Sequence, residues 1–315
     1  MIVVTGAAGF IGSNLVKLLN DSGRVDIVAI DDLGDGSKAK NLADCVIADY
    51  YDKREFLQQL SAGGFNLDVI ETVFHMGACS DTTEQDGRYM MENNFTYSKM
   101  LLEQCVSAKV PLIYASSGAV YGQSEDFAEL PANERPLNVY GYSKLAFDQF
   151  VRQRLPKPVS LVAGLRFFNV YGPREQHKGR MASVIWHFWH QARAANKIKL
   201  FAGSHGYADG EQRRDFVHVE DVAAATLWFA SRPASASGIY NLGTGVSASF
   251  NDVARLVAEH CGNTSLEYIP FPGDLHPAYQ PHTRAEISKL RGVGYHGPFR
   301  DIEHGVSNYL DKLDH

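Results

Sequence analysis

The sequence has few cysteines, no excess of basic residues and no long hydrophobic run, and each of these features argues against a class of protein. Its four cysteines are scattered without a CxxC pair, which favours reduced thiols in a cytosolic protein over a disulfide-stapled secreted domain. The net charge of −6 argues against a general nucleic-acid surface, which needs basic residues to release counterions. No apolar run approaches the length of a membrane span, and MIVVTGAAGF lacks the basic start of a signal peptide. We therefore expect a cytoplasmic protein with no nucleic-acid or membrane partner.

What the chain does contain is an alternation of strand and helix patterns. Helical periodicity is found over 10–20, 52–60, 84–107 and 140–155. Such alternation predicts right-handed βαβ units and a parallel sheet covered on both faces. The strand-like runs are IVVTG (2–6), DIVAID (26–31), CVIAD (45–49), VIETVFHMGA (69–78) and PLIYASS (111–117).

This order becomes less regular beyond residue 169. We predict an α/β fold with a doubly wound Rossmann-type sheet and a smaller, partly interleaved α/β substrate domain. The dinucleotide-binding domain is expected over 1–168, with a returning segment at about 215–245, and the substrate-binding domain mainly over 169–315.

The stretch TGAAGFIG carries Gly6, Gly9 and Gly12 between the first strand and the first helix. Glycines at this spacing allow a tight turn and close approach of a pyrophosphate to the helix N-terminus. An acidic residue about twenty positions on completes the dinucleotide pattern. Asp31 and Asp32 stand there, at the end of the second strand. We therefore favour dinucleotide binding over the alternative that the glycines only allow the strand-to-helix turn.

The choice between NAD and NADP stays open on these residues. An acid at the end of the second strand bonds the ribose hydroxyl and repels a 2′-phosphate, which favours NAD. Lys38 and Lys53 follow the second and third strands. They either reach a phosphate or remain solvated, as most loop lysines do.

A second group of residues suits hydride transfer at a carbinol. Ser116 and Ser117 end the fifth strand, and Tyr140 and Lys144 are four apart, which places them on one helix face. A nearby ammonium favours the phenolate form of a tyrosine, and a serine hydroxyl can hold the same substrate oxygen. A bare YxxxK pattern is common, but its place after a dinucleotide motif favours catalysis over a solvated helix face.

The stretch NVYGPREQHKGRMAS (169–183) follows another strand-like run, LVAGLRFFNV. It places several charged side chains in a loop and includes the pair Lys178–Gly179. Glycine beside lysine allows a sharp turn, and a buried lysine can act as an acid or base. The alternative is that Lys178 only contacts the cofactor or substrate phosphates.

Six stretches resemble the extended short-chain dehydrogenase/reductase family of nucleotide-sugar enzymes: TGAAGFIG, ASSGAVYG, YGYSK, LRFFNVYGPRE, RRDFVHVEDVA and YNLGTG. GPREQHKGRMASV, EQDGRYMMENN, RPLNVYGYSK and EYIPFP are further similar to its ADP-L-glycero-D-manno-heptose 6-epimerases. The resemblance implies an isomerase that interconverts the two ADP-glycero-manno-heptose epimers at C6 by transient oxidation and re-reduction. Tightly bound NADP is implied as the cofactor, ahead of NAD. It also implies an ADP-heptose substrate, a cytoplasmic role in lipopolysaccharide core biosynthesis, and a homo-oligomer, for which a pentamer is indicated.

The resemblance also implies functional residues at matching positions. The implied catalytic residues are Ser117, Tyr140, Lys144 and Lys178. The implied cofactor contacts are Gly6, Gly9, Phe10, Ile11, Gly12, Asp31, Asp32, Lys38, Lys53, Met76, Gly77, Ala78, Cys79, Ser80, Asn93, Tyr140, Lys144, Val170 and Lys178. The implied substrate contacts are Asn169, Arg180, His187, Phe201, Ala202, Gly203, Ser204, Arg214 and Tyr279.

Three positions depart from the family pattern. Arg180 stands where a serine is usual, and it either pairs with the diphosphate or points outward. Met76 replaces an acidic residue, and main-chain contacts there would survive that change. The segment HGYADGEQR (205–213) is longer than usual and is expected to form a surface loop.

The run WHFWH places His187 and His190 three apart on a probable helix, a spacing compatible with a metal pair. No carboxylate or cysteine cluster accompanies them, so we expect no metal. The two tryptophans, Trp186 and Trp189, are expected to pack in the core.

Three alternative functions remain. A C4-epimerase of another nucleotide sugar would share the Ser-Tyr-Lys group without needing the HKG loop. A sugar 4,6-dehydratase would place an Asp-Glu pair near the serine, where this chain reads SSGAVYG. A catalytically inactive dinucleotide sensor is disfavoured because Tyr140 and Lys144 are both present.

Overall fold

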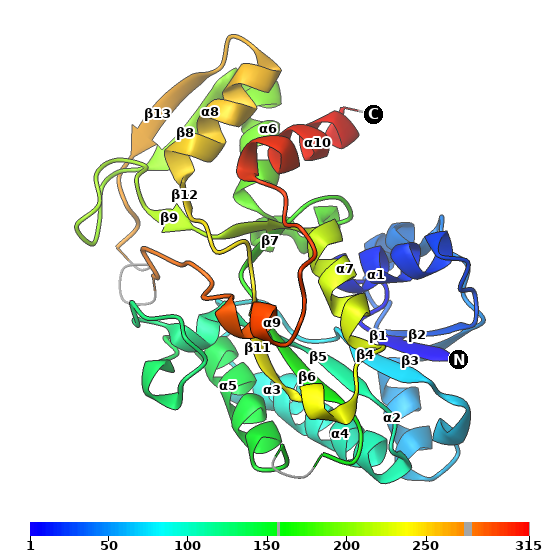
Figure 1. The fold of residues 1–315 in the computed structure, drawn as a ribbon. Helices are drawn as coiled ribbons and strands as arrows, with labels where there is room; N and C mark the ends of the chain where they lie inside the picture. The colour runs from blue at the N-terminus through cyan, green and yellow to red at the C-terminus, as the bar shows by residue number, and fades with distance from the viewer. Residues whose placement is uncertain (156–157, 274–278, 315) are drawn as a thin grey trace.

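The computed structural model describes residues 1–155, 158–273 and 279–314 and has two lobes (Figure 1). The larger lobe is built on a seven-stranded sheet, and the smaller lobe lies beyond the carboxyl ends of its strands. The predicted domain ranges include residues 156–157, 274–278 and 315, which lie outside the described residues.

Every neighbouring pair of strands in the large sheet is parallel. The strand order reverses direction beside β1, which is where open α/β sheets bind ligands. The doubly wound Rossmann-type class is therefore confirmed. In spatial order the strands are β11 (Gly238–Leu242), β6 (Val162–Phe167), β5 (Leu112–Ser117), β4 (Thr72–His75), β1 (Ile2–Thr5), β2 (Ile27–Asp31) and β3 (Asp49–Asp52).

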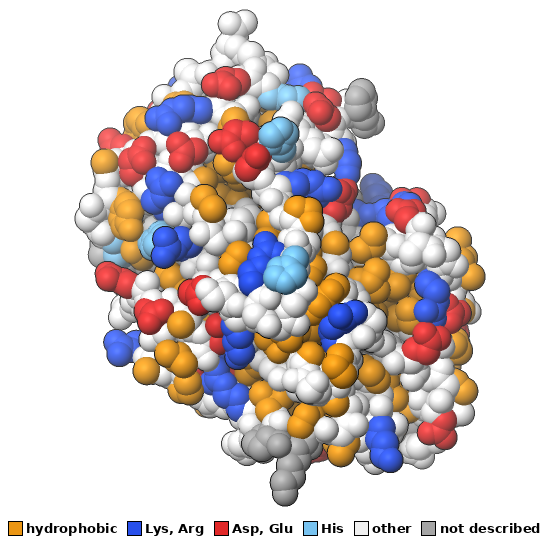
Figure 2. All heavy atoms as spheres, viewed as in Figure 1, with side chains coloured by type: hydrophobic (Ala, Val, Ile, Leu, Met, Phe, Trp, Pro, Cys, Tyr) orange, Lys and Arg blue, Asp and Glu red, His pale blue; other side chains and the backbone are white. Residues whose placement is uncertain are grey.

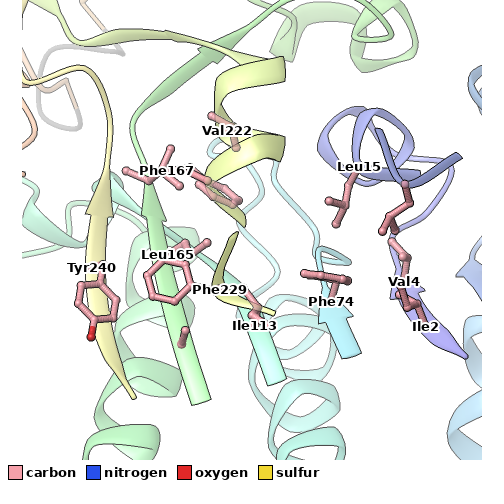
Figure 3. Packing of buried hydrophobic residues seen from close by; sticks show 14 of the residues in the cluster. Ile2, Val4, Leu15, Phe74, Ile113, Leu165, Phe167, Val222, Phe229 and Tyr240 are labelled. Atoms are coloured by element: carbon pink, nitrogen blue, oxygen red, sulfur yellow. The ribbon is translucent and has the colours of Figure 1, made fainter. Parts of the chain in front are cut away.

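Two hydrophobic layers cover the sheet, because successive strand residues point to opposite faces. Val4 and Phe74 face α1 (Phe10–Asp21) and α7 (Val219–Phe229), a layer seen from close by in Figure 3. Val3 and Val73 belong to the opposite layer. The helices of that layer are α2 (Lys53–Ser61), α4 (Tyr97–Ala108) and α5 (Val139–Arg152).

The smaller lobe has its own core. In this lobe β8 (Lys197–Phe201) pairs in parallel with β13 (Ser265–Ile269). The helices around the pair are α6 (Val184–Ala195), α8 (Phe250–Cys261) and α10 (Ile302–Leu313). The short parallel strands β7 (Asn169–Tyr171) and β10 (Phe216–His218) contribute residues to the cores of both lobes. β9 (Arg213–Arg214) pairs in antiparallel with β12 (Ala248–Ser249), and α9 (Ser288–Gly292) packs on the core of the larger lobe.

Several predicted boundaries are wrong. The run 45–49 is a strand only at its last residue, because pairing with β2 begins at Asp49. The run 69–78 is a strand only over β4, since a 3₁₀ turn, Leu67–Val69, precedes it and a loop follows. The predicted helix 84–107 begins later, as α3 (Gly87–Met91), and contains a π-helical segment, Glu92–Thr96, before α4.

The tryptophans of α6 are only partly buried, which corrects their assignment to the core. Trp186 and Trp189 stack with ring centroids 6.3 Å apart and pack against the core of the smaller lobe from outside. The expected surface loop 205–213 is also partly anchored, since Gln212 is buried.

The surface agrees with the charge balance of the chain. Acidic and basic side chains are interspersed on the face in Figure 2 rather than separated by sign. Among the described residues, no helix is long and apolar enough to cross a membrane. In the same part of the chain, no three His, Cys, Asp or Glu side chains are grouped as a metal site.

Candidate active site

The turn between β1 and α1 is closed so tightly that two of its positions require glycine. A Cβ on Gly12 would lie 2.0 Å from the carbonyl oxygen of Gly6. Gly6 has a φ of +66°, and a Cβ there would lie 2.6 Å from the backbone nitrogen of Gly77. The turn leads straight into the first turn of α1, whose N–H groups suit a pyrophosphate. The residues present therefore fit a bound dinucleotide.

Two acid–lysine pairs stand beside this turn. Asp31 is buried, accepts the backbone N–H of Ala8 at 2.7 Å and pairs with the Lys38 ammonium. The Asp32 carboxylate pairs with Lys53 at 2.9 Å. The backbone N–H of Gly34, together with Lys53, lowers the pKa of Asp32. Neither lysine is simply solvated, and the two acids do not present an uncompensated double negative charge.

The loop after β4, Met76–Ser80, lies next to the glycine turn. Asn93, in the π-helical segment, accepts from the Lys53 ammonium at 3.2 Å and so connects with the acid–lysine pairs. On the other flank, Val170 in β7 pairs with Val217 in β10. Ile11 packs against the core at the start of α1. The glycine turn, the loop Met76–Ser80 and the acid–lysine pairs with Asn93 thus lie beside the reversal of strand order.

Ser117, at the end of β5, lies beside Tyr140, at the start of α5. Burial raises the pKa of Tyr140, and the nearby Ser117 hydroxyl opposes that rise. The Ser117 hydroxyl also caps the turn that follows by accepting the N–H of Ala119 at 3.1 Å. Neighbouring Ser116 instead donates to Asp148 at 3.0 Å and is buried. Of the two serines, Ser117 is therefore the one beside the tyrosine.

Lys144 lies one turn after Tyr140 on α5 and is 6% exposed. Its ammonium donates to the carbonyl oxygen of Ala115 at 2.9 Å. Burial lowers the pKa of Lys144 to about 8, while the Asp148 carboxylate opposes that effect. A cation with little water around it thus stands near the phenol.

Lys178 lies in a 3₁₀ segment, Gln176–Met181, that is kinked at Gly179 (φ 51°, ψ −123°). A Cβ on Gly179 would meet nothing within 4 Å, so the positive φ rather than crowding favours glycine there. The Lys178 ammonium stands 5.1 Å from the centre of the Phe10 ring, at the start of α1. Burial lowers its pKa.

The loop carrying Lys178 is anchored at its base. The buried Glu175 carboxylate accepts the hydroxyl of Ser183 at 2.7 Å and also its backbone N–H. Arg174 pairs with Asp44 at 2.7 Å, which attaches the loop to the segment after β2. The position of Lys178 therefore follows from contacts with both lobes.

Arg180 points outward. Its side chain is 70% exposed and pairs with Asp81 at 2.7 Å. Bonds from Thr83 and this arginine lower the pKa of Asp81 to about 2. His187, on α6, contacts the Arg180 carbonyl oxygen at 3.3 Å.

A cluster of aromatic rings and one arginine forms the rest of the implied substrate set. The Arg214 guanidinium is buried and lies 4.9 Å from the centre of the Tyr279 ring. Phe271 packs against both Tyr279 and Phe201, with centroid distances of 4.9 and 5.3 Å. Sequence reasoning missed Phe271, although it lies in the quoted stretch EYIPFP.

The segment after Phe201, residues 202–204, is held by hydrogen bonds from Gln212. Gln212 donates to the carbonyl oxygen of Ala202 and to the hydroxyl of Ser204, both at 3.1 Å. Gly203 lies between them and is exposed. Asn169, at the start of β7, accepts the hydroxyl of Thr283 at 3.2 Å.

Known proteins with similar sequences are nucleotide-sugar epimerases and dehydratases. The model of the NAD dependent epimerase/dehydratase family matches residues 2–243. An ADP-L-glycero-D-manno-heptose-6-epimerase of Alkalilimnicola ehrlichii is 57% identical over 313 residues, covering 99% of this chain and 97% of the relative.

Solved structures give the same picture. The Helicobacter pylori ADP-L-glycero-D-manno-heptose-6-epimerase superimposes with a TM-score of 0.84 at 34% identity, covering 99% of this chain and 96% of that one. A Thermus thermophilus UDP-glucose 4-epimerase, in complex with NAD, has a TM-score of 0.80 at 28% identity, covering 99% and 98%.

The fold and the residue set together define a Rossmann-type enzyme that uses a nicotinamide dinucleotide. More specifically, the chain belongs to the NAD dependent epimerase/dehydratase family.

Proposed function

We propose that this chain is an ADP-L-glycero-D-manno-heptose 6-epimerase that interconverts the two C6 epimers of ADP-heptose. One observation carries the proposal: a relative with this name is 57% identical over 99% of the chain. The lysine on the kinked loop also suits the reaction, which needs protons handled at two different oxygen positions.

We further propose NADP as the cofactor. The glycine turn and the first turn of α1 would hold the pyrophosphate, and Lys38 and Lys53 would face a 2′-phosphate. Their pairing with Asp31 and Asp32 supports this, because it offsets the repulsion that two free acids would exert. A dinucleotide held there would supply the hydride chemistry, the oxidation of C6 to a ketone and the reduction of that ketone from its opposite face.

Tyr140 is assigned the proton on the substrate oxygen in one epimer. The ammonium of Lys144, one turn further along α5, would favour its phenolate by charge, and the Ser117 hydroxyl would hydrogen-bond the same substrate oxygen. Their fixed spacing on β5 and α5 suits this role, because a proton donor must be within hydrogen-bond reach of its target.

Lys178 is assigned the corresponding proton in the other epimer. Because a bound nicotinamide would exchange hydride with only one side of C6 at a time, the C6 oxygens of the two epimers would point in different directions. One base on a helix does not easily serve both, whereas a lysine on a kinked loop reaches a second position. The lowered pKa of Lys178 brings it closer to the range in which a lysine exchanges protons.

The remaining implied contacts are assigned to the substrate. The aromatic cluster with Arg214 suits a nucleotide base and its diphosphate, because arginine pairs with phosphates and rings stack on bases. Asn169 and His187 are assigned to the sugar. Arg180 is assigned no direct role, since its guanidinium is paired with Asp81 and exposed.

A C4-epimerase of another nucleotide sugar is the second candidate, supported by the likeness to a UDP-glucose 4-epimerase. The direct test is to incubate purified protein with each ADP-heptose epimer and, separately, with UDP-glucose, and to follow interconversion by NMR. Conversion of UDP-glucose without conversion of ADP-heptose would select the second candidate.

We also propose a cytoplasmic homo-oligomer, with a pentamer as the expected form, that supplies heptose for lipopolysaccharide core. The proposed division is a dinucleotide domain over 1–168 with a returning segment near 215–245, and a substrate domain over most of 169–315. Sedimentation equilibrium of the purified chain measures the oligomer number directly.

A further inference from the structure

A buried asparagine lies in the segment that carries one of the lysines proposed for the 2′-phosphate. The 3₁₀ segment Gly36–Leu42 follows β2 and contains both Lys38 and Asn41. Asn41 is 1% exposed, whereas most of the segment around it is exposed. Burying a side-chain amide costs free energy unless its N–H and C=O groups find partners. The proposed function leaves this side chain without a role.

The Asn41 side chain binds the glycine turn between β1 and α1. Its Nδ2 donates to the carbonyl oxygen of Ala8 at 3.0 Å. The N–H of Ala8 donates to the Asp31 carboxylate, which pairs with the Lys38 ammonium. Because Lys38 and Asn41 are three positions apart, they share one side of the 3₁₀ segment. The segment is thus attached to the turn at Ala8 through both of these side chains.

The same asparagine binds the loop that leads to Lys178. Nδ2 of Asn41 donates to the carbonyl oxygen of Arg174 at 3.1 Å and lies 3.0 Å from Nδ1 of His177. Its Oδ1 accepts the side-chain amide of Gln176 at 3.2 Å. The backbone takes part as well, since the Arg174 guanidinium donates to the Asn41 carbonyl oxygen. Asn41 is therefore joined to the residues just before Lys178 through both its side chain and its backbone.

The protonation state of His177 suits its contact with Asn41. Burial and the charges of Lys38 and Lys178 lower the pKa of the His177 ring, so the ring is neutral at about pH 7. With its proton on Nε2, the ring presents a lone pair on Nδ1 to the Asn41 amide. Nδ2 of Asn41 thus has one acceptor in the glycine turn and two in the loop.

We propose that Asn41 is a positioning residue that couples the segment carrying Lys38 to the loop carrying Lys178. A phosphate bound at Lys38 would then steady the loop, because ordering one side of a hydrogen-bonded link reduces the opening of the other side. The inference rests on the proposed function for the roles of the two lysines. It adds that recognition of the cofactor's phosphate and placement of the second proton carrier are connected through one residue.

Amide hydrogen exchange tests the coupling without any substrate. NADP should protect the loop at 174–179 more than NAD does, because only NADP carries a 2′-phosphate for Lys38. Both dinucleotides are used at saturating concentration, so that occupancy does not differ. We expect exchange in the loop to be about 2- to 10-fold slower with NADP, the range that corresponds to one net hydrogen bond. In Asn41→Ala this difference should vanish.

A second variant breaks the same link from the loop side. Arg174→Met removes the bond to the Asn41 carbonyl oxygen and the pair with Asp44, while the Asn41 side chain stays in place. This variant should reduce the difference between NADP and NAD. The proposal is wrong if the difference survives in Asn41→Ala or, should that variant not fold, in Arg174→Met.

Asn14→Ala is the matched control. Asn14 is also buried and donates at 2.9 Å to two backbone carbonyl oxygens, those of Phe10 in its own helix and Pro173 in the same loop. Because Asn14 lies on α1, outside the segment of Lys38, its loss should loosen the loop with either dinucleotide and keep the difference between them. Equal loss of the difference in Asn14→Ala would show that any anchor of the loop has this effect, which would reject the assignment to Asn41.

Single-turnover kinetics give a second readout, which a purely structural role would not produce. Asn41→Ala should slow hydride exchange by about 10-fold with the same ADP-heptose epimer that Lys178→Met slows, because small misplacements of a reacting group have large effects on rate. The two substitutions act on one group, so their effects should not add. Exchange with the epimer assigned to Tyr140 should change little. Equal slowing of both epimers would contradict a role through Lys178.

The failure of this inference is distinguishable from the failure of the proposed function. Equal affinity of the wild type for both dinucleotides would reject NADP as the cofactor and the coupling with it, since both begin at Lys38. A preference for NADP with equal protection of the loop by NADP and NAD would reject the coupling alone. A wild-type protein that converts no ADP-heptose would reject the proposed epimerase, and the exchange result, which needs no substrate, would still stand.

Discussion

Two lysines of the candidate site, the buried Lys144 and the half-buried Lys178, stand on different kinds of structure. Lys144 stands on α5, one turn from Tyr140, with its ammonium bonded to the carbonyl oxygen of Ala115. Lys178 stands on a short 3₁₀ segment kinked at Gly179, with its ammonium over the Phe10 ring. Burial lowers the pKa of both. Lys144 is thus fixed by a helix and a hydrogen bond, whereas Lys178 is placed by a loop and an aromatic ring.

This difference in surroundings suggests different roles for Lys144 and Lys178. The Lys144 side is connected through buried polar groups to the sheet: Asp148, one turn further along α5, binds Tyr114, Ser116 and Arg166. The Lys178 side depends on loop anchors such as Glu175. The proposed mechanism, in which protons are handled at two oxygen positions, would use one proton carrier on a helix and a second on a loop.

The largest expected effect on turnover is at Tyr140, on helix α5. Tyr140→Phe keeps the ring but removes the hydroxyl that we propose transfers the proton, so kcat should fall by about 10²–10⁴ while cofactor stays bound. Steady-state turnover and the cofactor content of the purified variant measure this. Tyr142→Phe is the control, because that ring lies on the same helix but is 53% exposed. Normal turnover of Tyr140→Phe would remove Tyr140 from the mechanism.

A smaller effect, selective for one of the two epimers, is expected at Lys178. Lys178→Met should bind both ADP-heptose epimers yet strongly slow hydride exchange with one of them, whereas Tyr140→Phe should slow the other more. Single-turnover measurements with each epimer test this. Lys99→Met is a matched control, since Lys99 also stands over an aromatic ring, at 5.5 Å from the centre of Phe150. A rise in KM, equal for both epimers and with kcat intact, would leave Lys178 only a binding role.

The next effect concerns cofactor choice. Lys38→Ala and Lys53→Ala should each weaken NADP binding by about 10- to 100-fold, since a charge-assisted contact contributes about 1.5–3 kcal/mol. NAD binding should change much less. Titrations of both dinucleotides check this, with Lys40→Ala as the control because Lys40 is exposed in the same segment as Lys38. Equal losses for NAD and NADP would contradict a phosphate-binding role.

The smallest effect is expected at Arg180. Its pair with Asp81 is exposed, and such pairs contribute about 0.2–1 kcal/mol. Arg180→Ser should therefore change KM by less than about threefold and lose that change at high salt. Asp81→Ala should give a similar result. A large, salt-insensitive rise in KM for Arg180→Ser alone would restore the implied substrate contact.

The sequence by itself determined the fold class and the glycine turn between β1 and α1. Both follow from local rules: alternating patterns predict a parallel sheet, and the turn between β1 and α1 excludes a Cβ at Gly12. The spacing of Tyr140 and Lys144 likewise places them on one helix face, as the structure has them.

Only the tertiary structure decided which polar groups meet. The sequence allows Asp31 and Lys38 to form an ion pair. The burial of Asp31 against the Ala8 amide, however, depends on how the glycine turn packs. Asn41 could not be recognised as a contact of the loop before Lys178, because its partners there are 133–136 positions away in the chain. Tyr279 meets Arg214, and Phe271 meets Phe201, through packing of residues that are distant in the chain. The physical reason is that periodicity records which face of an element is buried, whereas hydrogen-bond partners come from residues that are distant in the chain.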